Sequence, residues 1–383
     1  MNTIKSKYDV IIIGGGFMGA SSAFFMAKRG LKVLLLERDK IGQYASGVNF
    51  GNVRRQGRHL KQLDLANRSL SLWKQLPELI GEDLEFIPSG HMRVCYQESS
   101  IAQLEAYANA PEAKELGIQI LTGKQLREKF PYLGHEVVAG SLAPFDGHAN
   151  PRLAAPAFAR AAKKLGATVL EGVEVTTIEK SNAGFSVLCK TGENFHSEQL
   201  LVTAGAWGEK LSNQMNESVP LFARGPQMSV TEPLPYRFKT VIGVSTNVTE
   251  EELYFRQIPR GNIIIGGCNR SIPDMETRTV QFEPKSLILQ MQQMARIAPE
   301  IGNVNIIRTW SGIESYLPDS LPIMGPSSTT DGLYYAFGFC GHGFQLGPAV
   351  GDVMAELITT GSTSTHIESF SIKRYTESLK RSA

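Results

Sequence analysis

The stretch Tyr8–Gly30, YDVIIIGGGFMGASSAFFMAKRG, contains the pattern that decides the fold. Val10–Ile13 is a short β-branched run, which is typical of a buried parallel strand. A glycine-rich turn follows, and Phe17–Arg29 then has helical character up to Gly30, a residue type that commonly ends helices. The next segment, LKVLLLER, predicts a second buried strand that ends at Glu37. Strand, turn, helix and strand together make one βαβ unit.

The glycines of this unit have the G-x-G-x-x-G spacing of a dinucleotide-binding turn. Gly14 allows the tight turn, Gly16 lets the backbone approach a pyrophosphate, and Gly19 lets the helix pack closely on the strand. Glu37 lies about 20 residues further on, where an acid can accept hydrogen bonds from a ribose diol. A membrane span is the alternative interpretation of the apolar run, but a span rarely carries this glycine spacing followed by a matching strand.

Length and composition restrict the class of protein further. A chain of 383 residues can form two domains, and a net charge of +2 predicts neither a nucleic-acid nor an anionic-membrane partner. The four cysteines are scattered, without the close spacing of a zinc site or a redox pair. Buried free thiols suit a reducing compartment, and no small-residue cleavage site precedes the first strand, so we expect a cytoplasmic protein without a membrane span or bound metal.

A second glycine-rich segment, near the other end of the sequence, indicates which adenine dinucleotide the protein binds, NAD or FAD. DGLYYAFGFCGHGFQLGPAVGDVMAELI predicts a strand over Leu333–Phe337, a glycine-rich loop, and a helix from about Gly347. The N-terminus of that helix can face an electron-rich group, such as the pyrimidine end of a flavin, which gains negative charge on reduction. A nicotinamide cofactor has no such requirement, so this segment favours FAD. The residues 151–205 add a helix, strands and a hairpin that would complete the nucleotide-binding domain.

The βαβ unit, TAGAW, WSGIESYLPDSLPIMG and GFCGHGFQLGPAVG resemble, in order, the D-amino-acid oxidase-type flavoprotein family, in particular its sarcosine oxidase and glycine oxidase branch. The resemblance implies an α/β fold, with a discontinuous Rossmann-like FAD-binding domain and a second, mixed-sheet α+β substrate domain. It assigns residues 1–85, 146–215 and 325–383 to the FAD-binding domain and residues 86–145 and 216–324 to the substrate domain.

The same resemblance implies a set of residues beside the cofactor. Val175 resembles a valine that contacts adenine through its backbone, and Gly341–Gln345 resemble the loop that borders the flavin ring. The full expected set is Gly14, Gly16, Phe17, Met18, Gly19, Glu37, Arg38, Ser46, Asn49, Gly51, Asn52, Val175, Ala204, Gly205, Trp207, Gly312, Gly341, His342, Gly343, Phe344 and Gln345.

The chemistry that the resemblance implies is loss of a hydride from the carbon beside an amine nitrogen to flavin N5, which leaves an imine. A substrate carboxylate would need a cation, preferably an arginine. NVRRQGR offers Arg54, which resembles an arginine beside the flavin, and Arg58, which fits a carboxylate-binding arginine with a one-residue offset. Tyr254 resembles a substrate-contacting tyrosine, and alternation along a strand places Arg256 on the same face. The candidate catalytic residues are Arg54, Arg58, Tyr254, Arg256, Glu314 and His342.

Several positions depart from the family pattern. Gly312 stands where sarcosine oxidases carry the cysteine that attaches flavin, so we expect non-covalent FAD; Cys340 fits no known attachment position. Gln345 replaces a carboxylate-binding lysine. Glu314 replaces a carboxylate-binding arginine, which could favour a substrate with a second, positive group. Ile264 replaces a lysine that activates oxygen, which puts the oxidase interpretation in doubt because a fixed cation stabilises developing superoxide.

The sequence therefore predicts an FAD-dependent oxidase or dehydrogenase for the CH–NH bond of a small amino acid. We favour an N-substituted glycine, similar to sarcosine or iminodiacetate, or a cyclic imino acid; D-amino acids remain an alternative. Oxygen, a quinone or an electron-carrying protein could take the electrons. A subunit of a hetero-oligomeric amine dehydrogenase is a further alternative, with which the Lys/Arg-rich segment 372–383 is compatible. His91 could face the flavin or simply satisfy a hydrogen bond in a sheet, and Trp310 is expected in the core.

Overall fold

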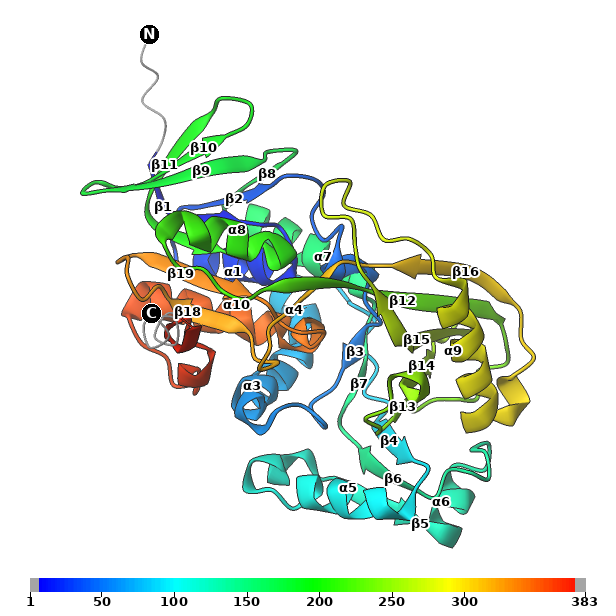
Figure 1. Cartoon of the computed structure of the whole chain (residues 1–383). Helices are drawn as coiled ribbons and strands as arrows, with labels where there is room; N and C mark the ends of the chain where they lie inside the picture. Colours follow the sequence, from blue (N-terminus) through cyan, green and yellow to red (C-terminus); the bar gives the residue numbers. More distant parts are fainter. Residues whose placement is uncertain (1–6, 376–383) are drawn as a thin grey trace, which may run out of the picture.

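The computed structural model describes residues 7–375, so most of the Lys/Arg-rich segment 372–383 lies outside the described residues. Figure 1 shows two lobes, one around the strands coloured blue, green and orange and one around the yellow-green and cyan strands. Each lobe is built on its own large sheet, and β3 (Asn52–Val53) and β7 (Gly147–His148) form a small two-stranded sheet between them. None of the helices within residues 7–375 is long and apolar enough to cross a bilayer.

The first sheet has the order β18-β19-β11-β1-β2-β8. Five of these strands run parallel, and only β18 at the edge is antiparallel to its neighbour. The hairpin of β9 and β10 extends from β11. The bounds are β1 Tyr8–Ile13, β2 Val33–Glu37, β8 Thr168–Glu171, β9 Val175–Ser181, β10 Gly184–Cys189, β11 Asn194–Val202, β18 Ile323–Pro326 and β19 Leu333–Phe337.

The predicted βαβ unit is confirmed, because β1 and β2 pair in parallel on either side of α1 in the chain. α1 packs against α7 and α10, and α10 packs in turn against α3, so the helices cover one face of the sheet. Aromatic rings fill the contact, with Phe17 against Phe158, Trp73 and Phe344. The helices are α1 Phe17–Lys28, α3 Leu63–Trp73, α7 Pro151–Lys164 and α10 Gly343–Thr360, with short helices α2 Ala45–Val48, α4 Leu76–Ile80 and α8 Gly208–Ser212.

The predicted start of the last helix, about Gly347, is wrong by one turn. α10 begins at Gly343 and includes Pro348, although proline and glycine both disfavour helix interiors. Burial outweighs these propensities here. Gly347 lies so close to the Phe17 ring that a Cβ on it would overlap the ring, and Leu346 is fully buried in the same core.

The second sheet has the order β16-β12-β15-β14-β13-β4-β6-β5, and β17 pairs with β12. It is antiparallel except for the pairing of β13 with β4. Its strands are β4 His91–Cys95, β5 Gln119–Thr122, β6 Ala139–Ala143, β12 Phe222–Pro233, β13 Val241–Val244, β14 Leu253–Gln257, β15 Asn262–Ser271, β16 Ile306–Ser311 and β17 Glu314–Tyr316. The helices beside it are α5 Ile101–Ala108, α6 Gly123–Lys129 and α9 Pro284–Ile297.

The pairing of the strands locates the two lobes in the sequence. Strands of the first sheet come from residues 8–37, 168–202 and 323–337, and those of the second from residues 91–143 and 222–316. The predicted domain boundary at residue 325 falls inside β18, whose pairing with β19 places it in the first sheet.

Candidate flavin and substrate cavity

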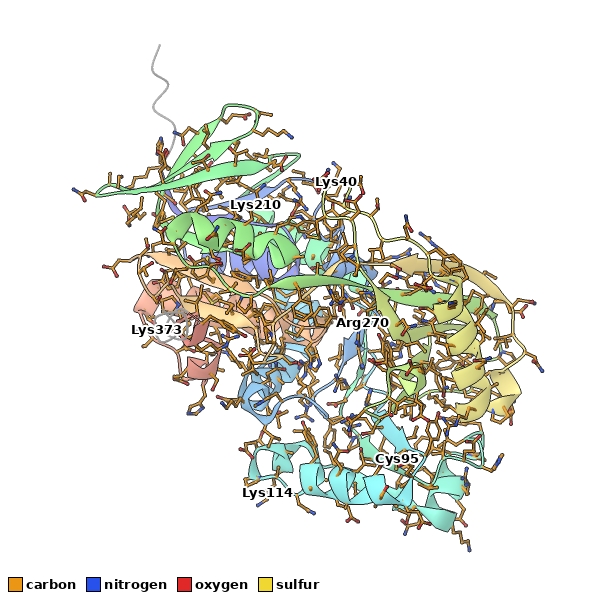
Figure 2. The ribbon with its side chains drawn as sticks, viewed as in Figure 1. Lys40, Cys95, Lys114, Lys210, Arg270 and Lys373 are labelled. Atoms are coloured by element: carbon orange, nitrogen blue, oxygen red, sulfur yellow. The ribbon has the colours of Figure 1, made fainter. Side chains whose placement is uncertain are left out.

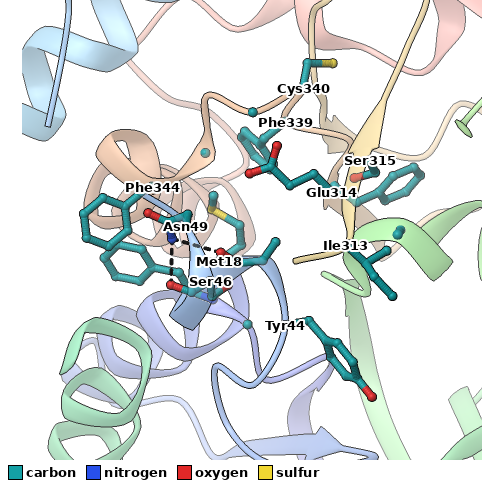
Figure 3. A pocket seen from close by; sticks show the side chains of 18 of the residues that line it. Met18, Tyr44, Ser46, Asn49, Ile313, Glu314, Ser315, Phe339, Cys340 and Phe344 are labelled. Carbon is teal, nitrogen blue, oxygen red and sulfur yellow. Dashed lines mark hydrogen bonds between the residues drawn. The ribbon is translucent and has the colours of Figure 1, made fainter. Parts of the chain in front are cut away.

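A cavity of about 480 Å³ lies where the two lobes meet. Its walls come from the start of α1, the end of β2, the loop 40–58, the starts of β4 and β9, the loop 203–207, β14, β17 and the loop before α10. Figure 3 shows part of it, with Met18, Asn49 and Phe344 on one side and Glu314 across the open space. Elements distant in the chain therefore converge on one site.

The N-terminus of α1 borders the cavity. Gly14 has φ +109°, and a Cβ on it would lie 2.6 Å from the carbonyl oxygen of Thr203. Both the backbone angle and the close approach require glycine. Gly16 caps the helix, and the N–H of Phe17 donates a hydrogen bond of 2.8 Å to Ser46 Oγ. The remaining N–H groups of the first turn, which have no acceptors within the helix, can bind an anion.

Glu37 lies at the C-terminal end of β2, against this turn. The residue is 8% exposed, and its carboxylate accepts hydrogen bonds from the backbone N–H of Gly15 at 2.6 Å and of Asp39 at 2.8 Å. Burial raises the pKa of Glu37, while these two N–H groups oppose the rise. The carboxylate lines the cavity and keeps unused lone pairs, so it can accept hydrogen bonds from a diol.

A group of flat side chains covers the neighbouring wall. The Arg38 guanidinium lies 3.8 Å from the centre of the Trp207 ring, and Tyr44 packs against that ring at 5.1 Å. The Tyr44 hydroxyl donates to Asp39, which fixes the stack. Val175 lines the same cavity. This wall of stacked planar side chains is suited to bind a planar base.

The N-terminus of α10 also faces the cavity, beside that of α1. Gly341, His342, Gly343 and Phe344 line it, and Gly341 has φ +74°. Met18 touches Gly343 so closely that a Cβ there would lie 2.9 Å from Met18 Cε, which links the two helix N-termini. One cavity is thus bordered by two partial positive charges, an arrangement that suits a cofactor with one anionic and one electron-accepting end.

The three arginines of NVRRQGR have different environments. Arg55 is buried and pairs with the fully buried Asp146, with Nε 3.1 Å from Oδ1. Arg54 and Arg58 line the cavity instead. Arg58 donates from Nε to the carbonyl oxygen of Arg54 at 2.6 Å and from Nη1 to that of His342 at 2.9 Å. Arg54 donates to the carbonyl oxygen of Gln56.

Mutual repulsion and burial act on these guanidinium groups. Burial lowers the pKa of Arg58 to about 9, with a further contribution from the charge of Arg54, and burial also lowers the pKa of Arg54. The pKa of Arg58 stays above neutral pH, and Arg54 keeps its charge because a guanidinium group is not deprotonated in proteins. The pKa values of His91 and His342 lie well below the usual range, because both rings are buried and face Arg54, so both are neutral.

Sequence reasoning missed Arg93. It lines the cavity from β4, two residues after His91, and burial lowers its pKa to about 10 with a contribution from Arg54. Strand alternation from His91 would have indicated it, because residues i and i+2 lie on one face. His91 itself is 3% exposed, and its Nδ1 lies 3.0 Å from Gln56 Nε2, so it faces the cavity and also satisfies a hydrogen bond.

The opposite wall carries the acidic groups. Tyr316 donates a hydrogen bond of 2.7 Å to Glu314 Oε2, and burial raises the pKa of Glu314. Arg270, labelled near the middle of the molecule in Figure 2, pairs with Glu252 at 2.6 Å. Tyr254 lines the cavity on this side, and burial raises its pKa, so its hydroxyl is protonated at neutral pH.

Comparison with known proteins decides the family. The model of the family "FAD dependent oxidoreductase" matches residues 9–357. This chain belongs to that family. It is therefore an FAD-dependent oxidoreductase, of the kind that oxidises amino acids or amines, and its cofactor is FAD. The expected family and fold class are confirmed.

Among relatives of this flavoprotein, the glycine oxidase of Geobacillus kaustophilus is 28% identical, and the alignment covers 96% of this chain and 97% of the relative. An opine oxidase subunit of Rhizobium meliloti is also 28% identical, with 96% and 98% covered. Among solved structures, the L-proline dehydrogenase from P. horikoshii has a TM-score of 0.88 at 27% identity, with 99% of both chains covered.

The residues present fit FAD. The structure brings most of the expected cofactor residues to the cavity, and the buried Nδ1 of His342, which has no hydrogen-bond partner among the described residues, faces the same space. The α1 turn would hold the pyrophosphate, Glu37 the ribose and α10 the flavin end. The expected residues that line the cavity are Gly14, Gly16, Phe17, Met18, Glu37, Arg38, Ser46, Asn49, Asn52, Val175, Ala204, Gly205, Trp207, Gly341, His342, Gly343 and Phe344.

Four expected cofactor residues do not line the cavity. Gly19 and Gly51 provide close backbone packing behind it, against Gly14 and Ala149. Gly312 packs on Val48. Gln345 is fully buried, with Nε2 donating 2.8 Å to the carbonyl oxygen of Ala66, so it ties α10 to α3. The earlier helix start turns this side chain away from the cavity.

The expected role of Arg256 as an anion ligand is not supported. Its Nε donates 2.7 Å to the carbonyl oxygen of Phe50 and its Nη1 lies 3.1 Å from His148 Nδ1, outside the cavity. Arg256 and Tyr254 both contact Phe50, as expected for residues on one face of β14, and the hydrogen bonds of the Arg256 guanidinium to Phe50 and His148 hold it outside the cavity. Trp310 donates to Val48 and packs with Ile264 in an apolar cluster, as expected for a core residue. Cys340 lines the cavity, but its Sγ points away from Glu314 and donates to Gly338.

Proposed function

We propose that this flavoprotein oxidises the CH–NH bond of a small amino acid, namely an N-substituted glycine or a cyclic imino acid. The observation that carries the proposal is that carboxylate-binding arginines lie beside the expected flavin end of one cavity. The cationic wall of Arg54 and Arg58 adjoins the N-terminus of α10, to which Arg58 is bound through the carbonyl oxygen of His342. A carboxylate held by that wall lies beside the expected flavin end of the cavity.

The side chains of the cavity suit the removal of a hydride from the carbon beside an amine. Bound FAD supplies the two-electron oxidant for this reaction. Arg54 orients the substrate through its carboxylate, and the protein contributes mainly this alignment. His91 and His342 are neutral at physiological pH, so they add no charge that would repel an ammonium group. The substrate loses a hydride from carbon and a proton from nitrogen, and water hydrolyses the resulting imine.

The relatives support this substrate class. The glycine oxidase, the opine oxidase subunit and the L-proline dehydrogenase named above are each similar to this chain over nearly its whole length. D-amino acids are the second candidate, because a primary amine with a carboxylate meets the same requirements in this cavity. Ile264 packs in an apolar cluster and supplies no cation for oxygen activation, whereas Arg54 is a cation beside the expected flavin end; oxygen, a quinone and a protein are therefore all candidate electron acceptors.

The relative that is one subunit of an opine oxidase supports assembly with a second chain as an additional proposal. The four buried free cysteines support a reducing, cytoplasmic location, and the residues lining the cavity include no cysteine suited to attaching FAD, which supports non-covalent binding.

Anaerobic mixing of the holoenzyme with a panel of amino acids tests the proposal. We expect sarcosine-like, iminodiacetate-like or cyclic imino acids to bleach the oxidised-flavin absorbance, and Arg54→Gln to raise the concentration required. Bleaching by primary D-amino acids alone would select the second candidate. A panel in which no amine bleaches the flavin would disprove the proposal.

A further inference from the structure

Arg93 is a cavity residue whose hydrogen-bonding groups are unused. Its guanidinium lies over Gly57, where a Cβ would come within 2.8 Å of Arg93 Cζ. Gly57 also has φ +67°, so the glycine provides both the turn and the space for the guanidinium. The backbone of Arg93 pairs within the sheet, but its guanidinium forms no hydrogen bond or ion pair with any residue in the described range 7–375. Its five N–H donors are therefore available to a ligand.

The donors of the other two cavity arginines are partly used. Arg58 donates from Nε and Nη1 to the backbone carbonyl groups of Arg54 and His342. Arg58 thereby joins the segment 52–58 to the start of α10, which makes it mainly a positioning residue. Arg54 uses one N–H group on Gln56 and keeps the rest. Two guanidinium groups, those of Arg54 and Arg93, can thus each receive a carboxylate.

The charges on this wall are only partly balanced by the protein. The charges of Asp146 and Glu252 act on Arg54. Asp146, however, is fully buried and already accepts from Arg55 and from the backbone N–H of Gln56, and Glu252 pairs with Arg270. Within the described residues, Arg54, Arg58 and Arg93 form no ion pair with a carboxylate, and the charge of Arg54 lowers the pKa of both others. Bringing like charges together in a half-buried site is unfavourable unless an anion binds there.

We propose that the substrate carries two carboxylates, one bound by Arg54 beside the flavin end and the second bound by Arg93. This inference rests on the proposed amine oxidation and narrows its substrate to N-(carboxyalkyl) amino acids and dicarboxylic imino acids of similar size. A single carboxylate would leave most of the positive charge of the wall uncompensated. The opposite wall does not require a second positive group on the substrate, since Glu314 already accepts from Tyr316 and lies near Arg270.

Matched substrates isolate the second charge. Iminodiacetate, its monoamide and sarcosine share the glycine unit. The monoamide carries an uncharged amide in place of the second carboxylate of iminodiacetate. We expect the wild-type holoenzyme to be reduced by iminodiacetate with a kcat/KM at least ~10-fold above that with the monoamide, since a hydrogen-bonded charge contributes about this factor. Arg93→Gln should abolish the preference, mainly through KM, and Arg93→Lys should restore part of it.

An arginine outside the cavity provides the control for the substrate comparison. Arg308→Gln changes an exposed arginine on β16, outside the cavity, and should leave the preference unchanged. Equal reduction by iminodiacetate and its monoamide in the wild type would overturn the proposal. Equal losses for all three substrates in Arg93→Gln would also overturn it, because a merely structural role predicts them.

Binding of an inert analogue separates this inference from the proposed reaction. Thiodiacetate has sulfur in place of the amine and cannot form an imine, and (methylthio)acetate is its monocarboxylate counterpart. In calorimetry on the holoenzyme, we expect thiodiacetate to bind ~10- to 100-fold more tightly than (methylthio)acetate, and Arg93→Gln to remove the difference. That result without flavin reduction by any amine would support the dicarboxylate site and reject the oxidation. Equal binding of both analogues would reject the site.

Discussion

Replacement of Gly14 by alanine should release FAD, and Gly30→Ala provides a matched control. Both glycines flank α1 and have positive φ, +109° and +85°, so alanine introduces backbone strain at each, about 1–2 kcal/mol. They differ in their surroundings. The Cβ at position 14 would lie 2.6 Å from the carbonyl oxygen of Thr203 and 3.0 Å from Ala204 Cα, whereas nothing lies within 4 Å of a Cβ at position 30.

The clash must separate two walls of the cofactor site. Relief of the contact with Thr203 moves the α1 turn and the loop 203–205 apart by several tenths of an ångström, and both line the cavity. Loss of one or two hydrogen bonds to a charged phosphate costs about 1.5–3 kcal/mol each. FAD affinity should therefore fall by at least ~10-fold in Gly14→Ala, beyond any loss that the shared strain produces.

Titration of apoprotein with FAD, followed by quenching of flavin fluorescence, measures this difference. Gly30→Ala should lower the thermal stability but bind FAD within about 3-fold of the wild type, because its strain lies at the far end of α1. Equal FAD affinities in Gly14→Ala and the wild type would refute the assignment of this turn to the cofactor. Equal losses in both variants would show that strain, and not the geometry of the turn, accounts for the effect.

Four further predictions concern two buried carboxylates, the attachment of FAD and one thiol. Burial raises the pKa of Glu314 in the folded protein. The protonated carboxyl therefore contributes to the stability of the fold, and this stability is lost as the pH rises through the raised pKa. Glu314→Gln should therefore match the wild-type Tm near pH 4 and exceed it increasingly towards pH 7; a constant difference would contradict this. Asp146→Ala leaves the Arg55 charge and two backbone N–H groups unpaired, so it should destabilise the fold by about 3–5 kcal/mol in urea unfolding, a loss that Asp146→Asn should only partly share. Acid precipitation should release all FAD into the supernatant, and flavin retained in the pellet would disprove non-covalent binding. Cys340, whose pKa burial raises to about 11, should react slowly with iodoacetamide at pH 7.

Local patterns predicted the backbone of the cofactor site well. Gly14 and Gly16 lie where the G-x-G-x-x-G spacing placed them, because a tight turn between strand and helix has steric requirements that neighbouring residues alone express. The start of α10 was misplaced because propensity counts Gly347 and Pro348 against a helix, whereas packing of this turn on Phe17 depends on a residue more than 300 positions away.

The roles of the arginines could not be derived in this way. Arg54, Arg55 and Arg58 are equivalent in sequence, yet Arg55 pairs with Asp146, 91 residues away, and Arg58 binds a carbonyl group 284 residues away. Arg256 was expected in the cavity and lies outside it, while Arg93 was missed and lines it with its donors unused.

The amino-acid sequence by itself determined the βαβ unit, the glycine turn and the acid at the end of β2, because these depend on backbone sterics over about 30 residues. The tertiary structure alone decided which guanidinium groups are neutralised and which remain available. Coulomb interactions and hydrogen bonds act through space, and the partners of each arginine come from chain segments that only the fold brings together.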